Sequence, residues 1–226
     1  MLRPLWFKYH NKFTLDLYMN KQFFYGDALL IRPVLTENEH FTNSIATYLP
    51  EDDRWFDFTT YQEYTDKGEV NIKITNENIG VFIKGGSILP MRFRIRRSTK
   101  LMRFEPLTLI VALNSEESAS GMIYFDDEES FDYEDTSKYY LKKLMFQKDE
   151  LFIANLHDDF KITNRIERII LLGLKKKVKN VYYENFLDGR KSDLEFEVKA
   201  GNLLEIKRLQ ISMDNLWKIK LELSDE

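Results

Sequence analysis

The sequence predicts a mainly β fold built of antiparallel β-sandwiches, and three observations lead to this class. Short apolar runs recur along most of the chain, and Gly, Asp, Asn or Pro residues separate them. In residues 70–74 apolar and polar residues alternate strictly, so that successive side chains would face opposite sides of a strand. No long segment repeats its apolar residues at helical spacing. Together these features favour an antiparallel sandwich over alternating strands and helices.

The first 34 residues predict a buried strand close to the start of the chain. Residues 28–31 form a continuous apolar run, which is typical of a strand buried on both faces, and Arg32 and Pro33 close it. Such a start is typical of the end of a larger domain. Asp27 precedes this strand and could be a catalytic carboxylate. An acid at such a turn more often caps backbone N–H groups, and we favour that role.

The next strands fall into two sets, divided by a polar stretch at residues 114–121 that we interpret as a domain boundary. Within the first set, residues 79–90 predict a hairpin in which Gly85 and Gly86 supply the positive φ of a tight reversal. The first set comprises residues 45–49, 55–58, 70–74, 81–83, 88–89 and 107–113, and the second comprises residues 122–125, 139–146, 151–155, 168–172, 178–183, 194–198, 203–206 and 218–223.

A basic run at residues 92–103 could bind polyanions, because alternation with Phe93 and Ile95 would place several charges on one face of a strand. We favour a solvated sheet edge, where charges discourage pairing with other chains. The net charge of −4 over 226 residues gives no general attraction to nucleic acid or to an anionic membrane. We also expect no membrane span, since no apolar run approaches about 20 residues, and no targeting signal, since basic residues interrupt the apolar ones at the start of the chain.

Metal and cofactor sites are not indicated. The chain has no cysteine and only three widely separated histidines, which disfavours zinc ligation. Residues 126–135 hold seven carboxylates, but they lack the spacing and central glycine of a calcium-binding EF-hand loop. A solvated acidic loop is the favoured interpretation, and a weak cation site is the alternative.

Five segments, taken in chain order, resemble the C-terminal part of glycoside hydrolase family 31, the α-glucosidases. Residues 168–173 fit that family more weakly. The basic run after Pro90 is most similar to that of the glucosidase II catalytic α subunits. The five segments are Arg3-Pro4-Leu5; Gly26-Asp27 with Leu29-Leu30 and Pro33-Val34; Tyr48-Leu49-Pro50 with Trp55-Phe56-Asp57 and Tyr61; residues 81–90; and Asp126-Asp127 with Ser130 and Tyr133.

The resemblance implies a domain order in which a (β/α)8 catalytic barrel precedes a proximal and then a distal β-sandwich. Residues 1–34 would be the last segment of a truncated barrel, residues 35–113 the proximal sandwich and residues 114–226 the distal one. The family's two catalytic aspartates lie on upstream barrel strands. We therefore expect this chain to be a C-terminal fragment without catalytic, cofactor-binding or metal-binding residues, and inactive by itself.

For the parent enzyme, the resemblance implies an O-glycosyl hydrolase that removes terminal α-linked glucose with retention of configuration. It further implies N-glycan trimming in the lumen of the endoplasmic reticulum. The partners would be the missing catalytic barrel, a β-type subunit of glucosidase II and, through the parent, a carbohydrate substrate. The role of this chain would be structural.

An alternative from another class is a stand-alone carbohydrate-binding β-sandwich. Trp55 and Tyr61 would then contact sugar rings, together with Phe56 and Phe58. Alternation along a strand sends some of these aromatic side chains inward whatever the function, which weakens this interpretation.

Two departures from the family pattern affect local structure. Gly80 replaces a usual proline, which would loosen the entry to a strand, and Glu128 replaces a usual glycine where a turn favours positive φ.

A separate expectation concerns residues 1–34, whose apolar side chains would be exposed without a barrel. We expect deletion of that segment to improve solubility.

Overall fold

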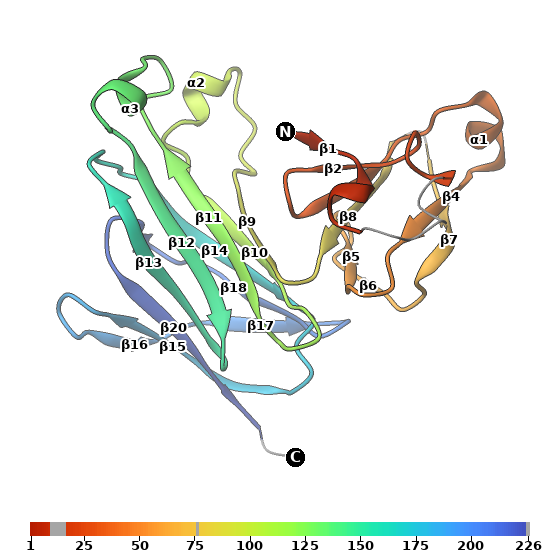
Figure 1. Cartoon of the computed structure of the whole chain (residues 1–226). Helices are drawn as coiled ribbons and strands as arrows, with labels where there is room; N and C mark the ends of the chain where they lie inside the picture. Colours follow the sequence, from red (N-terminus) through yellow and green to blue (C-terminus); the bar gives the residue numbers. More distant parts are fainter. Residues whose placement is uncertain (10–16, 76, 225–226) are drawn as a thin grey trace. The chain divides into compact units, whose positions relative to one another are not determined.

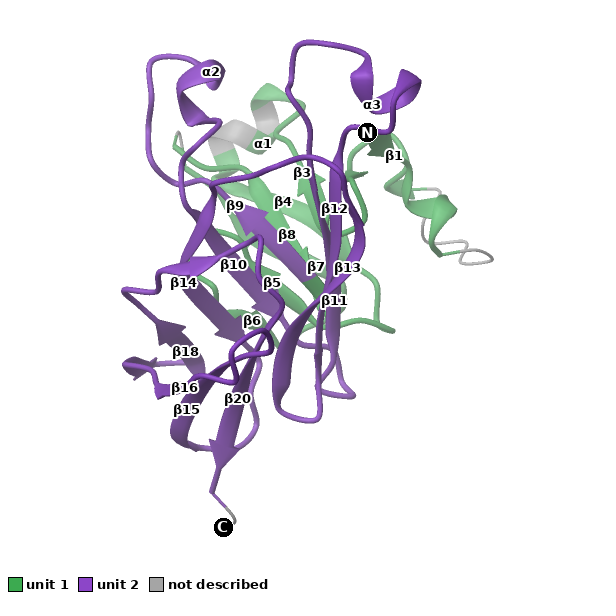
Figure 2. Cartoon of the chain, turned by 90° about the vertical axis from the view of Figure 1, so that its left-hand side faces the viewer, with its two compact units in different colours: residues 1–87 green, residues 88–226 purple. Residues whose placement is uncertain are grey.

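The computed structural model describes residues 1–9, 17–75 and 77–224, which form a mainly β structure with few and short helices (Figure 1). The predicted class, a mainly β fold of antiparallel sheets, is confirmed. The chain divides into two compact units, residues 1–87 and residues 88–226 (Figure 2).

Unit 1 contains a six-stranded antiparallel sheet in the order β1-β2-β3-β8-β5-β6 and a separate antiparallel pair, β4 and β7. Two short helices interrupt the strands in the described part of this unit. The elements are β1 (Leu2–Arg3), η1 (Leu5–Phe7), β2 (Phe23–Tyr25), β3 (Leu29–Arg32), α1 (Glu37–Thr42), β4 (Ser44–Leu49), β5 (Trp55–Asp57), β6 (Glu63–Tyr64), β7 (Gly68–Lys73) and β8 (Gly80–Lys84).

The described part of residues 1–34 contributes to the core of unit 1. Leu5, Phe24 and Leu30 are completely buried in one cluster with Trp55 and Phe82. The strand predicted at residues 28–31 exists, but it buries one face more than the other and pairs with β2 and β8. The structure does not show the described part of residues 1–34 as a segment of a barrel. Since these side chains complete a core, the structure speaks against the expected gain in solubility on deletion.

Unit 2 is one large sheet in the order β16-β15-β20-β13-β12-β11-β9-β10-β14-β18-β17, with β19 paired to β14. One pair, β10 with β14, is parallel. The elements are β9 (Ser87–Met91), α2 (Thr99–Met102), β10 (Leu107–Ala112), β11 (Ala119–Phe125), α3 (Asp132–Asp135), β12 (Tyr140–Gln147), β13 (Glu150–Asp158), β14 (Arg165–Leu172), β15 (Val178–Asn185), β16 (Lys191–Asp193), β17 (Phe196–Lys199), β18 (Leu203–Ile206), β19 (Ile211–Ser212) and β20 (Trp217–Leu223).

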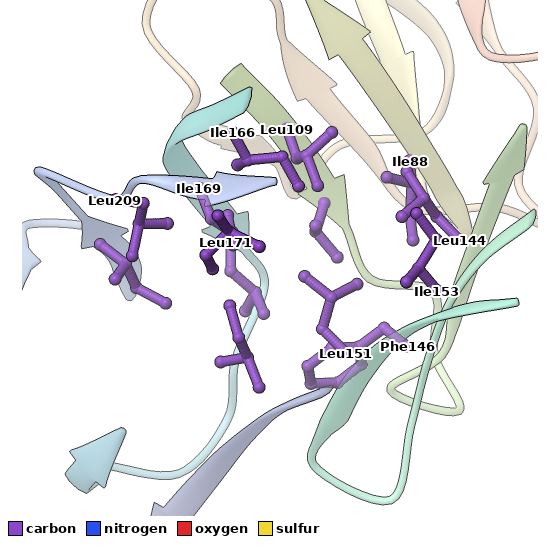
Figure 3. Close-up of a cluster of buried hydrophobic side chains, with 14 of the residues drawn as sticks. Ile88, Leu109, Leu144, Phe146, Leu151, Ile153, Ile166, Ile169, Leu171 and Leu209 are labelled. Carbon is purple, nitrogen blue, oxygen red and sulfur yellow. The ribbon is translucent and has the colours of Figure 1, made fainter. Parts of the chain in front are cut away.

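This sheet curls around a single apolar core, as in a sandwich. Leu109 of β10 and Leu171 of β14 belong to the same buried cluster as Leu144 of β12 and Leu151 of β13. Figure 3 shows these side chains pointing into one shared space from different parts of the sheet. Burial of many such aliphatic side chains, each worth roughly 1.5–3 kcal/mol, is the main favourable contribution to the stability of unit 2.

The glycine bend joins two sheets instead of closing a hairpin. β8 lies between β3 and β5 in unit 1, whereas β9 lies between β11 and β10 in unit 2. Gly86 has the positive φ that the bend requires, at 85°. The two compact units therefore divide at residue 87, and the boundaries expected after residues 34 and 113 stay a prediction.

A second glycine allows β9 and β11 to approach each other closely. A Cβ atom on Gly121 would lie 2.2 Å from the carbonyl oxygen of Ile88, far inside van der Waals contact. Only glycine fits this position without moving one of the two strands. Sequence patterns gave no indication of this constraint.

Arg32 is a buried cation that connects several parts of unit 1. Its side chain is 1% exposed, its Nε donates to the carbonyl oxygen of Ala46 at 3.0 Å, and its Nη2 lies 2.5 Å from Oε1 of Glu39. The Glu39 carboxylate also accepts the Leu35 N–H at 2.9 Å. Burial would raise the pKa of Glu39, but these hydrogen bonds outweigh it and hold that pKa below its usual value.

The turn after β11 confirms the expectation for Glu128, which has a φ of 59°. Its N–H donates to Oδ1 of Asp126 at 2.8 Å, so the acid two residues earlier holds the turn in place. The Glu128 carboxylate lies 3.8 Å from Arg92, a partly exposed ion pair that adds little stability. The main cost at this position is the left-handed backbone, which favours glycine.

We predict that Glu39→Gln lowers the free energy of unfolding by about 2 kcal/mol at pH 7, because it leaves the buried Arg32 without its anion. Since the folded-state pKa of Glu39 lies below its ordinary value of 4.5, the stabilisation is present above that value and is lost as pH falls below it. Urea denaturation from pH 7 to pH 3 should show the two proteins converging. Glu37→Gln, in the same helix, is the matched control, and a pH-independent difference would contradict the prediction.

We further predict that Glu128→Gly is more stable than Glu128→Ala by about 1 kcal/mol. Both variants lose the Arg92 ion pair, so the comparison isolates the cost of a side chain at positive φ. Urea denaturation at neutral pH measures the difference. Equal stability of the two variants would show that the turn is not strained by the side chain.

Candidate functional site

Trp55, one of the two expected sugar-contacting residues, lies inside the core of unit 1. Its side chain has no exposed surface, and its Nε1–H donates to the carbonyl oxygen of Pro50 at 2.9 Å. Its ring packs near that of Phe24, with centroids 6.2 Å apart. Stacking on a sugar needs an open aromatic face, so this position gives no support to a sugar-contacting role for Trp55.

Tyr61 lies at the surface, in the turn after β5. Oδ1 of Asp57 accepts the N–H groups of Thr59 and Thr60 at 2.8 and 2.7 Å, and the Tyr61 N–H donates to the Asp57 carbonyl oxygen at 2.9 Å. These bonds place Tyr61 in the left-handed region, with a φ of 61°, and leave it partly exposed. A sugar contact at Tyr61 stays a prediction.

Asp27 has two cationic partners instead of the expected backbone cap. Its carboxylate forms an ion pair with Arg3 and lies 3.4 Å from the Lys8 ammonium group. Its partial burial would raise the pKa, but Lys8 and Arg3 outweigh that effect and lower it. A general acid needs a raised pKa to hold its proton near neutral pH, so Asp27 does not fit that role.

A polar network in unit 1, which the sequence did not reveal, connects three distant segments. The Tyr9 hydroxyl donates to Oδ2 of Asp53 at 2.5 Å, and Nζ of Lys84 lies 3.1 Å from Oδ1 of the same carboxylate. Burial, and then the hydrogen bond to Asp53, raise the pKa of Tyr9. The three groups satisfy one another, and together they fasten the start of the chain to β8.

The basic run at residues 92–103 does not form the expected strand. β9 ends at Met91, and a loop leads from there to α2. Acidic side chains of unit 2 neutralise much of its charge. The ion pairs are Arg92 with Glu128 at 3.8 Å, Arg94 with Glu167 at 2.5 Å, Arg96 with Glu105 at 2.5 Å and Lys100 with Glu129 at 3.1 Å. This pairing favours a structural role over polyanion binding.

The acidic loop at residues 126–135 also forms hydrogen bonds within the protein. Oδ1 of Asp127 accepts the N–H groups of Glu129 and Ser130 at 3.2 and 3.0 Å, and the Ser130 bond, the larger effect, lowers the Asp127 pKa. Throughout the described residues, no group of three or more histidine or acidic side chains is arranged to hold a metal ion. The same residues contain no helix long and apolar enough to cross a membrane.

The sites described above all favour ionised carboxylates. Wherever a carboxyl pKa of a described residue is displaced, it is displaced downward, towards the ionised form. Acid catalysis in a retaining glycosidase needs one carboxyl with a raised pKa, roughly 5–5.5 Å from an ionised partner. The sites described here are ion pairs and backbone caps, which stabilise structure.

The sequence matches known α-glucosidases along most of its length. A sequence model of the "Glycosyl hydrolase family 31 C-terminal domain" matches residues 1–89. Human neutral alpha-glucosidase AB is 28% identical over 98% of this chain and 23% of the human protein. The Dictyostelium discoideum protein of the same name is 32% identical, with coverages of 98% and 23%. A probable glucan 1,3-alpha-glucosidase of Arabidopsis thaliana is 30% identical, with coverages of 98% and 24%.

Solved structures agree with the sequence matches. The Tris-bound glucosidase II alpha subunit superposes with a TM-score of 0.83 at 25% identity, over 98% of this chain and 25% of that one. The catalytic subunit in an ER glucosidase II heterodimeric complex shares the fold, with a TM-score of 0.84 at 24% identity and coverages of 98% and 25%.

The chain therefore spans about a quarter of the length of the curated relatives it matches. The resemblance that the five sequence segments indicated is confirmed. Residues 1–89 match the family 31 C-terminal domain, and the chain as a whole resembles the C-terminal part of the glycosyl hydrolase family 31 α-glucosidases, among them the neutral α-glucosidases and glucosidase II α subunits.

Proposed function

We propose that this chain is the C-terminal structural part of a retaining α-glucosidase and does not turn over substrate by itself. The observation that carries the proposal is the match to family 31 α-glucosidases over 98% of the chain. The downward-displaced carboxyl pKa values of the described residues support the second half of the proposal, because none of those groups is poised to donate a proton.

In this proposal, the catalytic carboxylates belong to a barrel domain, and the present chain braces that barrel. The family domain order that we propose retains residues 1–34 as the end of the barrel sequence, followed by sandwiches at residues 35–113 and 114–226. The exposed side chains of Trp6, Phe7 and Tyr25, which are 47%, 54% and 55% exposed, would supply part of the bracing surface.

The relatives suggest the pathway and the compartment. Glucosidase II is the activity named for the similar solved structures, so we propose trimming of terminal α-linked glucose from N-glycans in the endoplasmic reticulum. One of those structures is a complex with the binding domain of a regulatory subunit. A β-type subunit is therefore the protein partner that we propose for the whole enzyme.

A chimera tests this proposal. The segment of Dictyostelium discoideum neutral alpha-glucosidase AB that aligns with this chain would be replaced by residues 1–226. We predict hydrolysis of a fluorogenic α-glucoside within about tenfold of the unmodified relative, because a bracing segment changes the barrier by little more than 1.4 kcal/mol. The isolated chain should give no turnover above the enzyme-free rate.

Two controls make the result interpretable. The relative without the segment should be inactive or insoluble, and a chimera carrying Arg32→Leu should lose activity because a core ion pair of unit 1 is broken. A soluble, monodisperse chimera that lacks activity would contradict the proposed bracing role. Turnover by the isolated chain would contradict the proposed absence of a catalytic site.

A further inference from the structure

Unit 2 contains a pocket of about 390 Å³ at the end of its core, away from the ion pairs and turns discussed above. It lies between the segment that precedes β15 and the hairpin formed by β17 and β18. Four of its eight lining residues are aliphatic and three are consecutive lysines. The lining residues are Leu174, Lys175, Lys176, Lys177, Val178, Val198, Asn202 and Leu204.

The floor of this pocket is continuous with the hydrophobic core. Leu174 and Leu204 are 4% and 1% exposed and belong to the core cluster, and Val178 packs against it. Val198 is the register partner of Leu204, so the two side chains share a face of the sheet, yet Val198 remains 54% exposed. An exposed aliphatic side chain beside a buried floor offers a surface on which an apolar group would be shielded from water.

The mouth of the pocket is cationic. Lys175, Lys176 and Lys177 are exposed, and among the described residues no carboxylate lies within ion-pairing distance of any of them. Lys175 donates to the carbonyl oxygen of Ser115 at 3.2 Å, which is a neutral partner and does not compensate the charge.

Acidic side chains on the neighbouring strands already form ion pairs with other lysines. The Glu205 carboxylate forms an ion pair with Lys199, and Glu197 lies 2.8 Å from the Lys207 ammonium group. A bound anion would therefore meet three ammonium groups without displacing a partner from among the described residues.

We propose that this pocket binds a small anionic amphiphile. The carboxylate or phosphate of the ligand would lie against Lys176 and Lys177, and its alkyl chain would contact Val198 and Leu204. An apolar floor without charges would favour neutral ligands equally, and surface lysines without a pocket would attract any anion. The combination selects a molecule that has both properties.

The probe is decanoate, titrated calorimetrically into the 226-residue chain below the critical micelle concentration of the probe. We expect saturable binding with one site per chain. Decanol has the same chain without the charge, and acetate has the charge without the chain. Each should bind at least about tenfold more weakly, a difference of 1.4 kcal/mol. Raising the ionic strength should weaken the binding of decanoate and leave decanol unaffected.

Two variants locate the site. Charge reversal in Lys175→Glu/Lys176→Glu/Lys177→Glu should weaken decanoate binding at least about tenfold. The matched control, Lys143→Glu/Lys148→Glu/Lys161→Glu, reverses three exposed lysines of the same unit outside the pocket and should leave it unchanged. Val198→Trp should fill the pocket and abolish binding. Circular dichroism checks the folding of every variant.

Four outcomes would overturn the proposal. Absence of decanoate binding by the folded chain would exclude this ligand class. Equal binding by decanol would show that the lysines contribute nothing, and unchanged binding by the Val198→Trp variant would place the ligand elsewhere. Tight binding of an acidic peptide in place of decanoate would identify the pocket as a protein contact.

Discussion

The buried guanidinium group of Arg32 is the constraint on which unit 1 depends. A buried cation needs an anion and hydrogen-bond acceptors, and Arg32 obtains them from Glu39 in α1 and from the carbonyl oxygen of Ala46 in β4. These contacts fix β3 relative to the segment that follows it. Gly80 lies opposite Arg32 in β8, where a Cβ atom would be 3.2 Å from Cβ of Arg32. Gly80 thus leaves room for the arginine instead of merely loosening the strand.

The start of the chain is tied to the same structure by polar bonds between distant residues. The Gln22 side chain is buried and exchanges two hydrogen bonds with the backbone of Tyr48, at 2.7 and 3.0 Å. Asp53 joins Tyr9 to Lys84 in a similar way. In unit 1 these polar side chains hold segments together that are far apart in the sequence.

The positions of individual strands and turns were predictable from the sequence, but the strands with which they pair were not. Alternation and turn residues located most strands, and Glu128 adopts the positive φ that its place in the turn predicted. The strands flanking Gly85 and Gly86 were also located, but they belong to different sheets. Strand formation depends on neighbouring residues, whereas pairing depends on segments far apart in the sequence.

The candidate sites were predictable only in part. Burial of Trp55 was ambiguous, because alternation does not say which face of a strand is covered. The pocket beside Lys175 could not be foreseen, since part of its floor, Leu204, comes from β18.

Amide hydrogen exchange along β3 tests most directly whether the beginning of the chain belongs to the fold of unit 1. We expect the amides of Leu29–Arg32 to exchange as slowly as those of their partner β8, because both strands open only when the core around Arg32 unfolds. Rapid exchange in β3 beside a protected β8 would contradict it. That result would mean that residues 1–34 only rest against a unit that is already complete without them.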